Sequence, residues 1–157
     1  MQFSAPSALK EHFESLVIVL RKEIEEYGML LNLICEQQNC LMQHNPISLL
    51  QATAKIEVQL PNNQKATKDR ERAMQQLGQT LHCTPLTFEK LPSFAPESLR
   101  SLLDALTNEI ITLVKKIKSK TQLQQRLLNQ AQSINDSILK HLQPTSTSTY
   151  DSQGKMV

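Results

Sequence analysis

Cysteine and histidine side chains are the residues of this chain that could bind a metal ion. Cys40 and His44 stand four residues apart, a spacing that places two side chains on one face of a helix, and Cys35, His82 and Cys83 could complete a zinc site. However, no C-x-x-C pair occurs, and Cys35 and Cys40 project to different sides of a helix. We interpret them as small buried thiols and solvent-facing histidines, and expect no metal and no cofactor.

Carboxylates are plentiful, but catalytic signatures are missing. No Ser/His/Asp signature, phosphate-binding loop or G-x-G-x-x-G occurs in a chain with three glycines. The acidic residues lie among lysines and arginines on helical patterns, where charges usually form solvated faces with weak ion pairs. They are Glu23, Glu25, Glu26, Asp69, Glu71 and Asp104. The sequence therefore predicts a protein that is not an enzyme.

One basic cluster, KKIKSK at residues 115–120, is extended by Arg126. It contains no aromatic side chain for base stacking, and the net charge of the chain is only +2. A solvated helix face is the favoured interpretation over a nucleic-acid site, and an acidic protein partner stays open. We expect no nucleic-acid partner.

The composition favours a single helical domain. The chain has 157 residues, no tryptophan, few aromatics and few glycines, which disfavours a β-sandwich or barrel. Its longest purely apolar run, LVIVL at residues 16–20, is far shorter than the roughly 20 residues of a membrane-spanning helix. The odd number of cysteines and the start MQFSAPSALKEHFES, without an apolar signal region, predict a cytoplasmic protein with no stable membrane insertion.

Apolar residues at alternating steps of four and three predict an elongated, coiled-coil-like antiparallel bundle of three helices. The first helix spans about residues 8–43, and HNPISLL then forms a short turn with Asn45 as N-cap and Pro46 at the first helical position. A second helix, about 46–77, carries an apolar stripe and should kink or break near Pro61. The stripe comprises Leu49, Ala52, Ile56 and Leu60.

The third helix, about residues 97–142, has the strongest pattern and is the longest. The linker before it places apolar side chains among prolines, so we expect it to be ordered and to cap one end of the bundle. These side chains are Leu86, Phe88, Leu91 and Phe94. We assign residues 1–143 to the bundle. Residues 144–157, rich in Ser and Thr and without apolar periodicity, are expected to be a disordered tail.

The late part of the third helix is the main candidate for an interaction surface. Two polar seam positions, Lys120 and Gln124, either fix the register or mark where packing within the chain ends. An apolar row follows that would be an aggregation liability unless it binds a partner protein or a second copy of the chain. The row consists of Leu127, Leu128, Ala131, Ile134, Ile138 and Leu142. A homodimeric structural coiled coil is the alternative function.

Three blocks in order, HNPISLLQATAKIE, KDRERAMQQLG and the long last helix followed by TYDSQGK, resemble the FlgN-type flagellar export chaperones. The resemblance implies a cytoplasmic chaperone of the flagellar type III secretion system that binds hook-associated proteins, the proteins of the hook-filament junction, and prevents their premature assembly. It implies that the stretch from Leu123 to Leu142 binds the C-terminal helical segment of the client. It also implies delivery to the cytoplasmic domain of the membrane export gate, with Tyr150, Asp151 and Gly154 on the tail signature.

A physical argument agrees with this role for the tail. A disordered segment loses entropy when it docks, so one large side chain that fills a pocket gives modest, reversible affinity. We expect Tyr150 to be that anchor, with Gly154 as a flexible turn beyond it.

Overall fold

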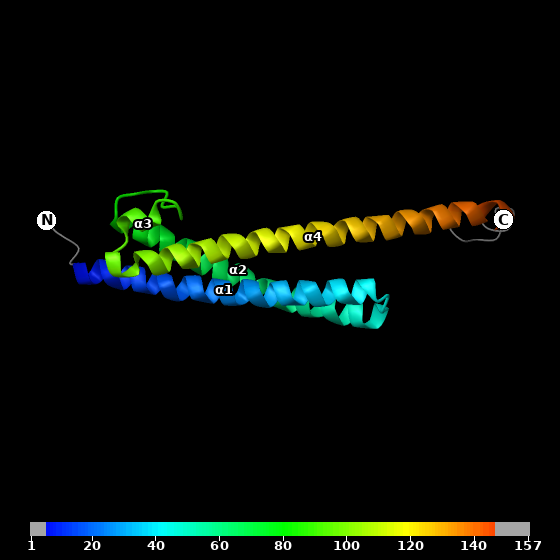
Figure 1. Ribbon diagram of the computed structural model, residues 1–157, viewed down its shortest axis with the longest axis horizontal. Helices are drawn as coiled ribbons and strands as arrows, with labels where there is room; N and C mark the ends of the chain where they lie inside the picture. Colours follow the sequence, from blue (N-terminus) through cyan, green and yellow to red (C-terminus); the bar gives the residue numbers. More distant parts are fainter. Residues whose placement is uncertain (1–5, 147–157) are drawn as a thin grey trace. The chain divides into compact units, whose positions relative to one another are not determined.

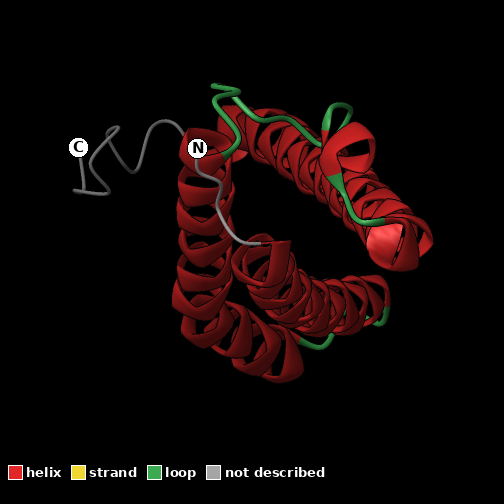
Figure 2. Ribbon diagram, turned by 90° about the vertical axis from the view of Figure 1, so that its left-hand side faces the viewer, coloured by secondary structure: helices red, strands yellow, loops and turns green. Residues whose placement is uncertain are grey.

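The computed structural model describes residues 6–146, without the side chains of residues 6, 131, 135 and 143–146. This part of the chain consists of helices and loops (Figure 2). The helices are α1 (Pro6–Met42), α2 (Pro46–Thr80), α3 (Leu91–Phe94) and α4 (Glu97–Ser146). The predicted all-α class and long last helix are confirmed. The chain divides within α4 into two compact units, residues up to Lys120 and residues from Thr121 onward.

Helices α1 and α2 lie side by side and antiparallel in the first unit (Figure 1). The turn between them forms as predicted, because the Asn45 side chain accepts a hydrogen bond from the Ser48 backbone N–H at 3.1 Å and Pro46 begins the helix. His44 lies within the turn and has a left-handed backbone conformation, with a φ of 54°. A polar cap and a proline thus fix where α2 begins.

Helix α2 continues through Pro61, so of the two predicted outcomes the break is not found, and the kink stays a prediction. Proline removes one helical N–H donor, and the carbonyl four residues earlier, on Glu57, loses its partner. Both residues lie on the exposed side of α2, where water can hydrogen-bond that carbonyl. The helix then extends to Thr80, beyond the expected end near residue 77.

The end of α2 requires a glycine two residues before it, at Gly78. The Cys83 N–H donates to the Gly78 carbonyl at 2.8 Å, and the His82 N–H donates to the Gln79 carbonyl at 3.2 Å, which is a Schellman C-cap. His82 occupies the left-handed position, with a φ of 55°. A Cβ on Gly78 would lie 2.7 Å from the Cys83 carbonyl oxygen, so only glycine lets the loop pack this closely.

The linker after α2 is ordered and packs on the bundle, as predicted. Leu91 in α3 is fully buried, and Leu86 and Phe88 pack against the core. Phe94 departs from the expectation, since 37% of its surface is exposed. The linker therefore closes one end of the bundle mainly through Leu91.

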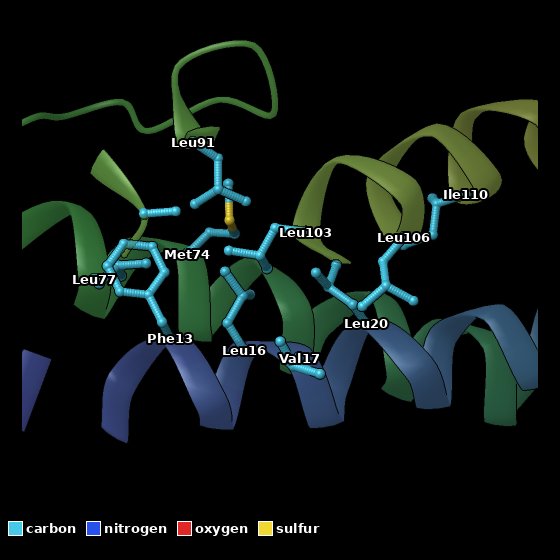
Figure 3. Packing of buried hydrophobic residues seen from close by; sticks show 11 residues of the cluster. Phe13, Leu16, Val17, Leu20, Met74, Leu77, Leu91, Leu103, Leu106 and Ile110 are labelled. Atoms are coloured by element: carbon cyan, nitrogen blue, oxygen red, sulfur yellow. The ribbon is translucent and has the colours of Figure 1, made fainter. Parts of the chain in front are cut away.

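The hydrophobic core of the first unit draws on all four helices (Figure 3). Each fully buried leucine contributes about 1.5–3 kcal/mol relative to an exposed one. The cluster contains Phe13, Leu16, Val17 and Leu20 from α1, Met74 and Leu77 from α2, Leu91 from α3, Ala95 after it, and Leu103, Leu106 and Ile110 from α4. The core therefore lies at the α3 end of the α1–α2 pair.

A layer of buried polar side chains follows the core along the α1–α2 contact, and it corrects two sequence interpretations. Glu23 and Glu26, predicted to be solvated, are 1% and 6% exposed. Glu23 accepts hydrogen bonds from Arg70 Nε at 2.9 Å and from Thr67 Oγ1 at 3.0 Å. Because the single Thr67 hydroxyl proton goes to Glu23, the Tyr27 hydroxyl, 3.0 Å away, donates to Thr67.

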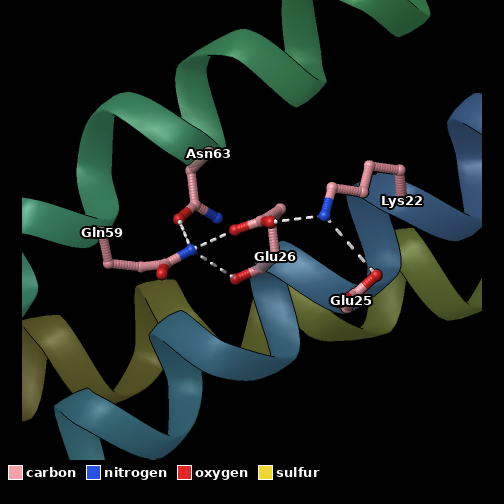
Figure 4. A network of polar contacts seen from close by, with 5 residues as sticks. All are labelled: Lys22, Glu25, Glu26, Gln59 and Asn63. Atoms are coloured by element: carbon pink, nitrogen blue, oxygen red, sulfur yellow. Dashed lines mark hydrogen bonds and ion pairs between the residues drawn. The ribbon is translucent and has the colours of Figure 1, made fainter.

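Glu26 belongs to a second part of this layer (Figure 4). Gln59 Nε2 donates to the Glu26 carboxylate and, at 2.9 Å, to Asn63 Oδ1, while Lys22 Nζ lies 3.0 Å from the other Glu26 oxygen. Gln59 and Asn63 occupy the buried seam of α2, and Leu60, which was expected there, is 42% exposed. The apolar stripe predicted for α2 is therefore wrong at Leu60: the neighbouring Gln59, whose amide donates to Glu26 on α1, takes the buried position instead.

Candidate functional site

The late part of α4 presents a row of exposed aliphatic side chains. Steps of four and three residues keep such a row on one helical face, and flanking members widen it. The exposed fractions of these side chains run from 42% to 61%, whereas Leu103 and Leu106, earlier in the same helix, are buried. The members are Leu123, Leu128, Ile134, Ile138, Leu139 and Leu142. We call this set the α4 apolar face.

Small side chains leave room between the large ones on this face. A shallow depression there is lined by Ser133, Ile134, Ser137, Ile138, His141 and Leu142. Serines one helical turn apart form a gap into which a side chain from another helix can insert, the geometry by which helices interlock. The face therefore has both the apolar surface and the relief that helix packing requires.

The sequence located most of this face. Leu139, which is 61% exposed, was missed because it lies off the four-three register, beside Ile138. Leu127 is half-buried, Gln124 is buried, and the Ala131 side chain is outside the description. The predicted tail residues Tyr150, Asp151 and Gly154 also lie outside the described residues, as does the disorder expected for residues 147–157, whereas α4 includes residues 144–146.

A family comparison covers the whole chain. The family described as FlgN protein matches residues 1–157. The chain belongs to the FlgN family. This family has a flagellar export chaperone role that implies binding of exported flagellar proteins, and FlgN proteins are not known as enzymes. Comparison with curated proteins and with solved structures gives no match.

The thiols and histidines of this FlgN-family chain do not converge. The three cysteines are free and half-buried. Helix α1 ends at Met42, so Cys40 and His44 do not lie on successive turns of one helix. His44 and His82 are exposed, as expected. Over residues 6–146, no group of three or more His, Cys, Asp or Glu side chains is placed to hold a metal ion.

The basic cluster is a solvated part of α4. Lys115, Lys116 and Lys118 are exposed and Lys120 is half-exposed, and none forms an ion pair within the described part of the chain. This agrees with the favoured sequence interpretation.

None of the helices that the structure describes is both long and apolar enough to span a bilayer.

Contacts within the polar layer change the pKa of the Glu26 carboxyl group. The hydrogen bond from Gln59 lowers the pKa of Glu26 below its ordinary value of 4.5, and the bond from Lys22 acts in the same direction against the opposing effect of burial. Reciprocally, Glu26 and then Glu25 raise the pKa of Lys22. Both groups stay charged at neutral pH, so they support the α1–α2 pair and not proton transfer.

Proposed function

We propose that this FlgN-family chain binds the C-terminal helical region of hook-associated proteins on the α4 apolar face. The supporting observation is the exposure of that face, with Ile134 at 60% and Ile138 at 51%. An amphipathic client helix would lay its own apolar stripe along α4 and bury both surfaces. Covering the client in this way prevents its premature assembly in the cytoplasm.

Moderate affinity suits this role. Ordering a client segment as it binds consumes part of the interaction free energy, so the complex forms and dissociates readily. We propose that the chaperone then delivers its client to the cytoplasmic domain of the export gate, with Tyr150, Asp151 and Gly154 as the gate contact. The tail resemblance and the anchor argument support this step.

The test is calorimetric titration of the full chain with a peptide from the C-terminal helix of a hook-associated protein of the same organism. Aspartates at Ile134 and Ile138 would place charge in the buried interface, and we expect Ile134→Asp plus Ile138→Asp to weaken binding by roughly a hundredfold or more. Ile18→Asp plus Val58→Asp is the matched control, because these side chains on α1 and α2 are 69% and 74% exposed. We expect the control variant to bind like the unmodified chain.

The tail is tested by titrating the variant Tyr150→Ala with the same client peptide and, separately, with the purified cytoplasmic domain of the gate. We expect client binding to be unchanged and binding of the gate domain to be weaker. Loss of client binding in Tyr150→Ala would assign the tail to the client instead. If the unmodified chain does not bind the peptide, the client proposal is wrong.

A homodimeric coiled coil is the second candidate, because the same exposed face could pair with its own copy. Sedimentation equilibrium separates the two functions. We expect a monomer at low micromolar concentration, whereas a dimer that Ile134→Asp plus Ile138→Asp dissociates would favour the structural coiled coil.

A further inference from the structure

A second cavity lies in the first unit, between α2 and the loop that leads to α3. Its volume is about 770 Å³, within the range of small-ligand sites. Met74, Leu86 and Phe88 supply apolar lining, and Arg70 borders the cavity with its guanidinium 5.2 Å from the centre of the Phe88 ring. The cavity is formed by residues that the α4 apolar face does not use.

Several side chains around this cavity, most of them exposed to solvent, have hydrogen-bonding groups without a partner among the described residues. Arg70 uses Nε and Nη2 to bind Glu23, which leaves Nη1 without a hydrogen bond inside the described part of the chain. The side chains of Gln75, Gln79 and Thr87 also make no hydrogen bond to described residues. Amides and hydroxyls both donate and accept, so together they match the alternating N–H and C=O groups of a peptide backbone.

Charge around the cavity favours a neutral ligand. The positive charge of Arg70 is compensated by Glu23 at 2.9 Å, and Glu71 adds a carboxylate to the lining. A phosphate or another anion would therefore gain little electrostatic attraction there. An uncharged, apolar ligand with carbonyl oxygens fits the remaining donors better.

We propose that this cavity binds a short, apolar peptide segment of a partner protein, two or three residues long. Its aliphatic side chains contact Met74, Leu86 and Phe88, and Arg70 Nη1 donates to one of its backbone carbonyl oxygens. The site is separate from the α4 apolar face and does not depend on the client proposal.

The experiment uses the full chain labelled with ¹³C at the methionine methyl groups and N-acetyl-Leu-Leu-N-methylamide as the ligand. Met74, a core residue, forms part of the cavity wall, whereas Met29 and Met42 are on α1 and exposed, so they report nonspecific contact. We expect a saturable chemical-shift change of the Met74 methyl without a comparable change at the other two. N-acetyl-Ser-Ser-N-methylamide should produce no saturable change.

Variants of adjacent residues on α2 complete the test. Gln75→Trp places a large ring in the cavity and should abolish the Met74 response, while Gln76→Trp, at an exposed neighbour outside the lining, should retain it. Ile134→Asp plus Ile138→Asp should also retain it, which separates this site from client binding. The proposal is overturned by an unresponsive Met74, by a response that survives Gln75→Trp, or by an equal response to the serine peptide or to inorganic phosphate.

Discussion

At His82 the backbone has a left-handed conformation that glycine adopts more easily than histidine. The residue has a φ of 55° and completes the C-cap of α2, where its own Cβ is unfavourable. We expect His82→Gly to raise the free energy of unfolding by about 0.5–1 kcal/mol, measured by urea denaturation.

The same substitution within a helix provides the control. His12 is exposed in the interior of α1, so His12→Gly should lower the free energy of unfolding by several tenths of a kcal/mol or more. A loss of stability in both variants would show that the His82 side chain contributes more than its backbone conformation costs.

At Glu26 the lowered pKa predicts a pH dependence. A carboxyl group whose pKa is lower in the folded chain than in the unfolded chain stabilises the fold above its ordinary value of 4.5, and this contribution is lost as the pH falls through the folded value. We expect Glu26→Gln to be less stable than the unmodified chain at pH 7 and the difference to shrink below about pH 4.5. Urea denaturation at a series of pH values measures it.

Glu25→Gln is the control for this prediction, since Glu25 lies one residue away and its side chain is 61% exposed. Its effect on stability should be small at every pH, because it pairs with Lys22 only at 3.7 Å on the surface. If the Glu26→Gln difference instead grows on acidification, the hydrogen bonds from Gln59 and Lys22 do not favour the charged carboxylate.

Within α2, Pro61 interrupts the hydrogen-bond ladder of an otherwise continuous helix. Alanine would restore the donor to the Glu57 carbonyl, and Pro61 is exposed, so no packing is lost. We expect Pro61→Ala to raise the free energy of unfolding by about 1–3 kcal/mol in thermal and urea denaturation, after allowing for the greater freedom of the unfolded chain. Asn62→Ala, at the next exposed position, should change stability by less than about 0.7 kcal/mol. An unchanged or lower stability of Pro61→Ala would mean that the proline ring is itself well accommodated.

The same helix shows how much of the structure the sequence could predict. Asn45 and Pro46 predict the start of α2 because a cap and a proline act within a few residues. Gln59 and Asn63 could not be assigned to the buried seam, since polar side chains resemble a solvated face until their partners are known. Glu23 is the clearest case: its partner Arg70 lies 47 residues away, and no local spacing reveals that pairing.

The candidate site was more predictable than the polar layer. A row of aliphatic residues in four-three register can be recognised in the sequence alone, and in the structure Ile134 and Ile138 are exposed. The cavity beside Phe88 could not be predicted, because it depends on how the loop after Gly78 folds back over α2.

Over the first unit as a whole, the core is unevenly distributed along the α1–α2 pair. The large cluster lies on the α3 side of the polar layer, while toward the α1–α2 turn the described apolar side chains that are buried are Leu30, Ile34 and Ala52. Opening of the turn end should therefore require less free energy than global unfolding.

Native-state hydrogen exchange measures this gradient. We expect amides of residues 16–20 to exchange near the rate set by global unfolding, and amides of residues 37–41, on the same helix, to exchange at least about tenfold faster. Equal protection along α1 would show that the polar layer transmits the stability of the core to the turn.

The Tyr27 hydroxyl, which donates to Thr67 within the polar layer, also gives the molecule an optical property. The chain has no tryptophan and two tyrosines, so Tyr150→Phe leaves Tyr27 as its single phenol chromophore. A phenol ring held in a fixed, asymmetric environment produces a near-ultraviolet circular dichroism band, and the band disappears when the ring rotates freely. Spectroscopy on that variant can therefore follow the separation of α1 from α2 in real time, without an attached dye.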